Sequence, residues 1–376
     1  MQKKFRWLVP LLLVIVLVAS ACGDDDDTTA SGGDNGSTAT TKASGGSSGG
    51  DCYGKTGCIP ADQPDVNKDG KVKIAILSPG DTNDNGYYES FVIAAREYAD
   101  KNDWDLVITD KINPSDAAEQ ARNACRQKPD MVAIAASELK DAIPVAGEDV
   151  CKGTVWYVAG GQGVEQTPYF FQTNDKVEEG QFATGVASGE VLKSMGATKA
   201  GFITGPELDF STTAYKAWAA GVKSVLPNAE TVATYTGDFD DSGLGREAAN
   251  AQLSQGVKLL YPYLGGATDA VADLGKSKGV LSVTPGTDRC SEDKFAISSI
   301  FSPGDYFAAA LKDFEAGKVK LGVTRTFRIG VDPVPTVKVC PTVKDAATAQ
   351  AAVDKTIKDI ASGTIDPAAK TKEFKG

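Results

Sequence analysis

The chain contains no histidine among its 376 residues. Histidine is the usual proton shuttle near neutral pH and the commonest metal ligand in proteins. Its absence excludes catalysis by a Ser-His-Asp triad or a Cys-His pair. No cysteines have the CxxC spacing typical of zinc sites. Carboxylate or lysine chemistry stays open.

Positive charge is also scarce. The chain has 39 Lys and Arg against 50 Asp and Glu, which gives a formal net charge of −11. Such a chain repels the phosphates of nucleic acid and the headgroups of anionic lipid. We therefore expect no nucleic-acid partner.

Only one long apolar run is present, at residues 7–21. It follows the basic Lys3, Lys4 and Arg6 and ends in small residues directly before Cys22, which is the pattern of an export signal. The run falls short of the roughly 20 residues that span a bilayer, so a transmembrane anchor is the weaker alternative. The small residues and Cys22 resemble the lipobox of bacterial lipoproteins. This predicts a signal peptide at residues 1–21, lipidation of Cys22, and attachment to the extracytoplasmic face of the cell membrane.

Residues 23–51 are mainly Gly, Asp, Ser, Thr and Ala. A segment with so little apolar surface cannot order itself by burial. We expect residues 22–70 to form a lipidated, flexible tether that includes a small loop between Cys52 and Cys58.

Six cysteines are left once Cys22 carries the lipid. An even number in an exported protein favours disulfides over a zinc cluster. The count alone leaves many pairings open. Neighbours in chain order are the favoured pairs: Cys52–Cys58, Cys125–Cys151 and Cys290–Cys340.

From Lys71 onward, apolar strand patterns alternate with helical patterns. Strands are predicted at residues 72–77, 106–108, 131–135, 155–158, 169–171, 200–203, 231–235, 259–263, 281–284, 297–300, 326–329 and 336–339. Helices are predicted at residues 87–101, 116–127 (capped by Ser115), 142–150, 176–193, 211–224, 242–253, 267–275, 304–315 and 346–362.

This alternation predicts an α/β fold with parallel sheets that helices cover on both faces. The number of β/α units exceeds one compact sheet, so we expect two Rossmann-like lobes joined by a hinge. In open parallel sheets, ligands bind beyond the carboxyl ends of the strands. In two lobes, those ends can face each other across a cleft.

The ordered part of the chain resembles the basic membrane protein (PnrA-like) family, the nucleoside-binding lipoproteins that deliver substrate to ABC importers. The matching stretches are residues 73–80, 84–89, 179–185, 201–205, 215–221, 235–241, 286–288 and 362–365. The resemblance implies the type I periplasmic-binding fold. We expect residues 71–172 with about 290–322 in the N-terminal lobe, and residues 173–289 with about 323–376 in the C-terminal lobe. Hinge segments are expected near residues 172–175, 287–290 and 320–324.

The resemblance also implies ligand contacts in the first β/α loop, from Asp84, Asn85, Tyr87 and Tyr88. Tyr87 aligns with a stacking aromatic residue of the family, and Asp288 with a carboxylate that binds ribose. Each has a structural alternative. Asp84 and Asp288 are also good helix-capping or turn residues, Asn85 an ordinary turn residue, and both tyrosines candidates for the core.

Tyr263, Gly265 and Gly266 follow another predicted strand. Tyr263 is a candidate second wall for a flat ligand, and the glycines allow close backbone approach. An ordinary helix-start loop is the alternative. Asp238, Asp240 and Asp241 invite a calcium site but lack the closing Glu of an EF-hand, so capping of the next helix is preferred.

The resemblance therefore implies a monomeric solute-binding protein that carries a small polar ligand, most simply a nucleoside, to an ABC permease, and that needs neither catalysis nor a metal or cofactor. A sugar-binding or autoinducer-binding sensor with the same fold is one alternative. A surface α/β hydrolase that uses Asp84 and Asp288 as paired carboxylates is another.

Overall fold

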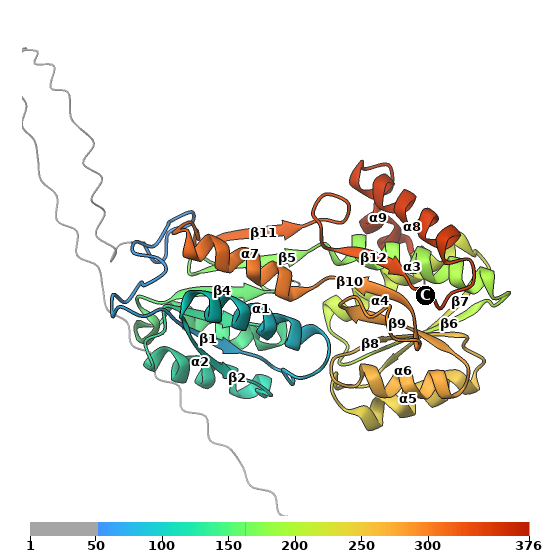
Figure 1. The fold of residues 1–376 in the computed structure, drawn as a ribbon, viewed down its shortest axis with the longest axis horizontal. Helices are drawn as coiled ribbons and strands as arrows, with labels where there is room; N and C mark the ends of the chain where they lie inside the picture. Colours follow the sequence, from blue (N-terminus) through green and yellow to red (C-terminus); the bar gives the residue numbers. More distant parts are fainter. Residues whose placement is uncertain (1–51, 162, 376) are drawn as a thin grey trace, which may run out of the picture. The chain divides into compact units, whose positions relative to one another are not determined.

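The structure is a computed structural model that describes residues 52–161 and 163–375, all within one compact unit. Two six-stranded sheets, each flanked by helices, form two lobes (Figure 1). The expected signal peptide, Cys22 and most of the tether lie outside the described residues. Within those residues, no helix combines the length and apolar character needed to span a membrane.

The sheet of the first lobe has the order β11-β5-β4-β3-β1-β2, and all its strand pairs are parallel. Its strands are β1 (Lys73–Leu77), β2 (Asp105–Thr109), β3 (Met131–Ile134), β4 (Val155–Ala159), β5 (Phe170–Asp175) and β11 (Val323–Phe327). Its helices are α1 (Tyr87–Asn102), α2 (Ala117–Arg126) and α7 (Pro303–Glu315), with 3₁₀ turns at Pro114–Asp116, Ser137–Gly147 and Asp149–Cys151.

The sheet of the second lobe has the order β12-β10-β9-β8-β6-β7, and only the β10–β12 pair is antiparallel. Its strands are β6 (Lys199–Thr204), β7 (Glu230–Tyr235), β8 (Leu259–Tyr263), β9 (Leu281–Gly286), β10 (Phe295–Ile300) and β12 (Thr336–Val339). Its helices are α3 (Val177–Ser194), α4 (Asp209–Val225), α5 (Ser242–Ser254), α6 (Thr268–Ser277), α8 (Ala346–Ala361) and α9 (Pro367–Glu373).

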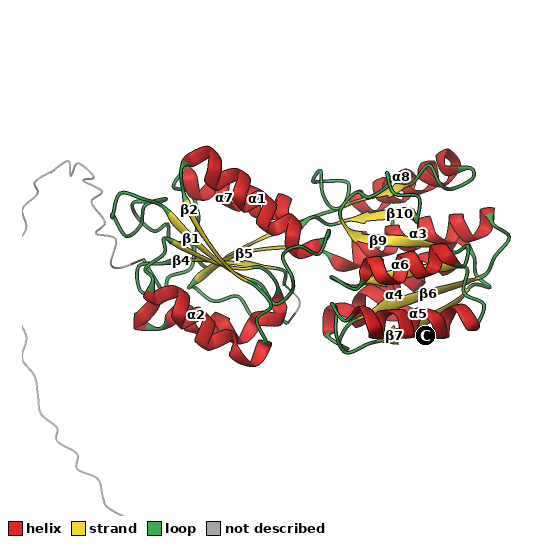
Figure 2. Ribbon diagram, turned by 60° about the horizontal axis from the view of Figure 1, so that its bottom comes forward, coloured by secondary structure: helices red, strands yellow, loops and turns green. Residues whose placement is uncertain are grey.

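Both lobes repeat one strand order, since β2-β1-β3-β4-β5 corresponds to β7-β6-β8-β9-β10. This is a doubly wound order, in which the chain reverses direction across the sheet beside the first strand. The prediction of two α/β lobes with mostly parallel sheets is confirmed, and helices lie on both faces of each sheet (Figure 2).

The chain passes between the lobes three times, and each expected lobe boundary needs a correction. At the first boundary, residues 173–175 belong to β5 of the first sheet and not to the second lobe. The crossings are β5 to α3, β10 to α7, and β11 to β12. Residues 295–300 form β10 in the second sheet, not in the first lobe, and residues 323–327 form β11 in the first sheet, not in the second lobe. A strand pattern in sequence does not reveal which sheet the strand joins. Of the three expected hinge segments, only residues 172–175 reach a crossing.

Alternating strand residues separate the two faces of the first sheet. Ile74 and Ile76 pack against α1 and α7 on one face, and Ala75 and Leu77 pack against α2 and the Ser137–Gly147 segment on the other. This period of two, with both faces apolar, is what a buried parallel strand requires.

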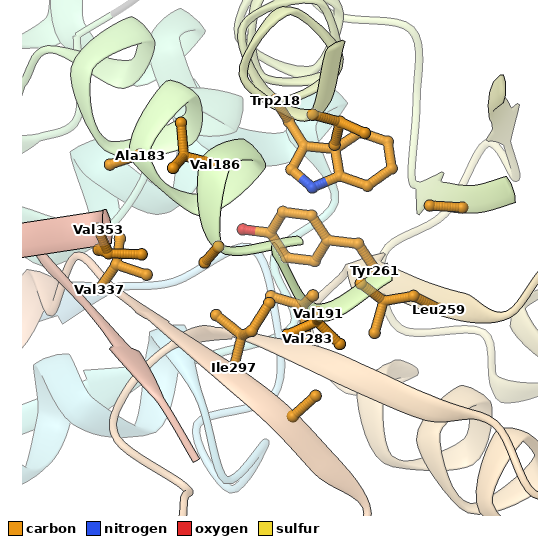
Figure 3. Packing of buried hydrophobic residues seen from close by; sticks show 14 of the residues in the cluster. Ala183, Val186, Val191, Trp218, Leu259, Tyr261, Val283, Ile297, Val337 and Val353 are labelled. Atoms are coloured by element: carbon orange, nitrogen blue, oxygen red, sulfur yellow. The ribbon is translucent and has the colours of Figure 1, made fainter. Parts of the chain in front are cut away.

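The largest core of the second lobe surrounds Trp218 of α4, which is fully buried. Figure 3 shows Trp218 beside Tyr261 of β8, among aliphatic side chains that include Val283 and Ile297. The indole N–H donates to Ser188 Oγ at 2.9 Å, so the buried polar atom has a partner.

Local details agree with the sequence in part. The three disulfides are those favoured by chain order: Cys52–Cys58, Cys125–Cys151 and Cys290–Cys340. The cap expected from Ser115 is wrong, because the Asn113 side chain accepts from the Ser115 N–H and begins a 3₁₀ turn before α2. The helix expected at 142–150 is a 3₁₀ run that contains Pro144, which lacks the N–H an α-helix needs.

Candidate functional site

A cavity of about 200 Å³ lies where the carboxyl ends of strands from both lobes meet. The first lobe and the β5–α3 crossing supply Tyr87, Tyr88, Ala136, Ser137, Glu138, Gly160, Gly161, Asn174 and Asp175. The second lobe and the β10–α7 crossing supply Val177, Gln181, Phe210, Phe239, Tyr263, Leu264, Gly265, Pro285 and Phe301. Its volume lies below the roughly 300–1,000 Å³ of pockets for drug-sized ligands, so a small molecule fits best.

The loop between β1 and α1 aims two tyrosines at this cavity. The Asp84 carboxylate accepts from the backbone N–H groups of Gly86, Tyr88 and Glu89 at 2.9, 3.2 and 3.0 Å, and so caps α1. Burial raises the pKa of Asp84, and these three hydrogen bonds oppose that effect. Asn85 has the left-handed φ of 51°, and its N–H donates to Glu89 Oε2 at 2.6 Å. Both residues shape the loop without lining the cavity.

Tyr88 joins two loops of the first lobe. Its hydroxyl donates to Glu138 Oε1 at 2.9 Å, which ties the start of α1 to the loop after β3. Burial, and then the nearby Glu138 carboxylate, raises the pKa of Tyr88 well above its ordinary value, so the phenol stays protonated. A Cβ added at Gly265 in the second lobe would lie 3.2 Å from the Tyr88 ring, so glycine permits the close approach.

Aromatic rings from both lobes form a continuous series along the cavity. Tyr87 lies edge-on to Tyr88 at 5.3 Å between ring centroids and 6.3 Å from Phe301. Phe301 lies 5.8 Å from Tyr263, which lies 6.4 Å from Phe210. These walls can hold the faces or edges of a flat ligand.

Two carboxyl groups, those of Glu138 and Asp175, are among the lining residues. Burial raises the pKa of Asp175 to about 7, with further upward contributions from Glu178 and Glu179. Burial also raises the pKa of Glu138, and the Asp240 carboxylate adds to this. No lysine or arginine is among the residues that the structure places around the cavity.

An amide completes the polar part of the cavity. Asn174 lines it beside Asp175, and the buried Asn174 Oδ1 has no hydrogen-bond partner within the described chain. An orphaned acceptor of this kind can pair with a donor on a bound molecule.

Four of the eight predicted ligand residues line the cavity: Tyr87, Tyr88, Tyr263 and Gly265. Asp84 and Asn85 hold the neighbouring loop, and the Gly266 N–H donates to Asp240 Oδ1 at 2.6 Å. Asp288 lies in the β9–β10 turn, where its carboxylate accepts from Lys338 Nζ at 2.7 Å and from the Cys290 N–H at 3.1 Å. The structure does not bring Asp288 to the cavity.

The acidic stretch after β7 has a structural role in this conformation. Asp241 caps α5 by accepting from the N–H groups of Gly243 and Leu244 at 2.7 and 3.0 Å, as preferred from the sequence. Across the described residues, no group of acidic or cysteine side chains has an arrangement suited to a metal ion.

Sequence reasoning missed several lining residues, including Glu138, Asp175, Phe210 and Phe301. A usable signal existed, because each stands at or just after the carboxyl end of a strand or at the start of the following helix. Applying that rule to every strand, and not only to the family motifs, would have selected these positions.

A family model described as "ABC transporter substrate-binding protein PnrA-like" matches residues 71–360. The chain belongs to this family. PnrA-like proteins bind substrate for transport and are not enzymes, which removes the hydrolase alternative.

Individual relatives match a smaller part of the chain than the family model does. A CD4+ T-cell-stimulating antigen of Listeria monocytogenes is 24% identical over 202 residues, which cover 52% of this chain and 55% of the relative. The chain thus matches about half the length of that protein. An ABC transporter nucleoside-binding protein of Lactococcus lactis is 31% identical over 99 residues, covering 26% of this chain and 27% of the relative.

Solved structures share the fold. A solute-binding protein of an ABC transporter system from Aeropyrum pernix superposes with a TM-score of 0.70 at 16% identity, covering 78% of this chain and 92% of that one. This PnrA-like chain therefore has the periplasmic-binding architecture expected from its sequence.

Proposed function

We propose that this protein is an extracytoplasmic, lipid-anchored receptor that captures a small polar ligand and delivers it to an ABC permease. The observation that carries the proposal is the cavity itself, which is walled by loops of both lobes at the carboxyl ends of their strands. Such a site is a typical place for ligands in folds of this type. Membership in the substrate-binding family supports the same role.

A nucleoside is the ligand class that we propose. Tyr87 and Tyr263 approach the cavity from opposite lobes and offer ring surfaces to a base. Glu138 and Asp175 can accept hydrogen bonds from sugar hydroxyls or from base N–H groups. The Lactococcus relative is itself a nucleoside-binding protein, which adds support.

Delivery would depend on closure of the lobes around the ligand. A ligand that contacts both lobes stabilises the closed arrangement by its differential affinity for that state. A permease that recognises the closed arrangement would then accept loaded receptors. A lipid on Cys22 would keep the receptor near the permease.

The direct test is to purify the protein under native conditions, denature it, and identify released small molecules by mass spectrometry. A thermal-shift screen of purine and pyrimidine nucleosides, with sugars as the comparison set, extends the test to a protein purified empty. Stabilisation should grow with ligand concentration as RT ln(1 + [L]/Kd). Stabilisation by sugars alone would contradict the nucleoside assignment, and no stabilisation by either set would contradict the receptor role for this cavity.

Lipidation needs its own test. Mass spectrometry of the mature protein should show diacylglyceryl-modified Cys22 at the N-terminus. A Cys22→Ala variant should be released from membranes. Retention of that variant in the membrane fraction would contradict a lipid anchor.

A further inference from the structure

The charge around the cavity is one-sided. Glu138 and Asp175 line it, and no described lining residue carries a positive charge. Both acids also act on the phenols of Tyr87 and Tyr263 and raise the pKa of each, after burial as the main cause. Both carboxyl groups and both rings line the same cavity.

Charged groups on the elements around Asp175 do not balance it. Glu178 and Glu179 at the start of α3 add negative charge on that side. The neighbouring cations pair with Glu179: Arg328 donates to Glu179 Oε1 at 2.6 Å, and Lys176 Nζ lies 3.9 Å from the same atom.

The surroundings of Glu138 are negative as well. Asp240, from the loop after β7, lies close enough to raise the pKa of Glu138. Burial raises the pKa of Asp240 in turn, and the Asp238 and Asp81 carboxylates add to this. Lys111, the cation near this group, pairs with Asp81 at 2.9 Å.

The walls favour positive charge for a second reason. Aromatic rings carry negative potential on their faces and attract cations, most strongly where water is excluded. Four aromatic residues at the cavity come from separate positions in the two lobes: Tyr87, Phe210, Tyr263 and Phe301. Rings on several sides, together with nearby carboxylates, are the parts from which proteins build cages for organic cations.

Carboxyl groups without a cationic partner in such a site are unfavourable when ionised, because burial removes their hydration. A neutral ligand compensates them only through hydrogen bonds. A cationic ligand pairs with their charge, whereas a phosphorylated ligand is repelled.

We propose that the cavity selects a ring-bearing organic cation, in particular a nucleoside whose base carries a positive charge through methylation of a ring nitrogen. This inference rests on the proposed function, because it names the ligand class for that same cavity. The base lies among the aromatic rings, Glu138 and Asp175 face its charge, and nucleotides with 5′-phosphates are excluded.

Protonation of Asp175 competes with binding of a cation, so the preference for cationic ligands depends on pH. Because the pKa of Asp175 is about 7 in the empty cavity, part of the population carries a proton there near neutral pH. A cation binds the ionised form better, so its affinity rises as pH rises through about 7. A neutral nucleoside carries no charge, so its affinity rises less when Asp175 ionises.

Isomeric ligand pairs separate charge from size. 1-Methyladenosine is a cation near neutral pH, and its isomer N6-methyladenosine is neutral. 3-Methylcytidine and 5-methylcytidine form the corresponding pyrimidine pair. Calorimetry at about pH 7.5 should give at least about tenfold tighter binding of the cationic isomer in one pair or both. Adenosine 5′-monophosphate should bind more weakly than adenosine.

Variants that remove the charge of Glu138 or Asp175 test whether these side chains cause the preference for the cationic isomer. Glu138→Gln and Asp175→Asn keep the shape of each side chain and remove its charge. Each should reduce the preference for the cationic isomer several-fold, and the double variant should abolish it. Asp288→Asn is the matched control, because it removes a carboxylate outside the cavity and should leave the preference unchanged. Thermal unfolding of each variant reports whether it has folded.

The outcomes are distinct. Equal or tighter binding of both neutral isomers would overturn the cation preference and leave a nucleoside receptor in place. A cation preference that survives the double variant would overturn the role of the two carboxyl groups. If none of the four isomers binds, both the preference and the nucleoside assignment fail.

Discussion

The two lobes share one strand order but present different chemistry to the cavity. The first lobe and its crossing bring both carboxyl groups, the amide of Asn174 and two tyrosines. The second lobe and its crossing bring mainly rings, aliphatic side chains and glycine, with Gln181 and Tyr263 as polar exceptions. The repeated topology therefore fixes where strand ends lie, whereas the residues just beyond those ends decide what is recognised.

The largest expected effect is on stability, where a substitution in the core of each lobe compares how much the two cores contribute to the free energy of unfolding. Trp218→Ala removes a fully buried indole and its hydrogen bond to Ser188 from the second lobe. We expect a loss of about 3–5 kcal/mol in the free energy of unfolding, measured by chemical denaturation. Trp156→Ala is the comparison in the first lobe, where the buried indole N–H has no hydrogen-bond partner among the described residues. A loss below about 1 kcal/mol for Trp218→Ala would show that the core around it is not needed.

A second prediction contrasts a carboxyl group in the cavity with one outside it. The pKa of Asp175 is raised to about 7 in the folded chain, so its contribution to stability is complete below about pH 4 and is lost as pH rises through about 7. Asn does not titrate. Relative to the parent protein, Asp175→Asn should therefore gain stability with rising pH, by up to roughly 4 kcal/mol at about pH 8.

Asp288→Asn should show the opposite sign in the same ligand-free unfolding series. Burial alone would raise the pKa of Asp288, but the hydrogen bonds from Lys338, the Cys290 N–H and Ser298, together with the Lys338 charge, hold that pKa below its usual value. The native carboxylate therefore stabilises the fold above about pH 4, and removing it should destabilise the chain modestly at neutral pH. Parallel pH profiles for the two variants would contradict this contrast.

The third prediction concerns the ring wall of the second lobe. Tyr263 contacts the rings of Phe202, Phe210 and Phe301. Tyr263→Ala should weaken binding of the identified ligand by about 2 kcal/mol, or roughly 30-fold, because both stacking surface and enclosure are lost. Tyr263→Phe should stay within about threefold in the same calorimetric assay. Equal losses for both variants would assign the effect to the hydroxyl and not to the ring.

The smallest effect is expected at Asp288. Its side chain is 42% exposed and paired with Lys338. Asp288→Ala should change ligand affinity by less than about twofold, as judged by calorimetry. A large loss of affinity would restore Asp288 to the ligand site that the family resemblance implied.

The fold was predictable because periodic apolar strands and amphipathic helices record burial directly in the sequence. The lobe assignment of β10 and β11 was not, since pairing partners are chosen by tertiary packing. Tyr87 and Tyr263 could be selected because they follow strands in recognisable motifs. Glu138 follows β3 outside those motifs, so only the general strand-end rule points to it, and its contact with the Tyr88 hydroxyl joins two loops that are 50 residues apart.

Asp84 and Asp288 show the limit of transferring site residues by alignment. Each stands near a strand end, as a ligand-binding carboxylate should. Local partners decide the outcome, since three backbone N–H groups hold Asp84 and the Lys338 ammonium holds Asp288. Such competition between a nearby donor and a ligand is invisible until the chain is folded.

Two of the three passages between the lobes also contribute to the cavity wall. Asp175 ends β5 at the first passage, and Phe301 follows β10 at the second. Any bending of these segments would displace a carboxyl group and a ring at the same time. The contacts to the ligand and the angle between the lobes are therefore coupled. A substitution that stiffens either passage would change the residence time of the ligand without contacting it.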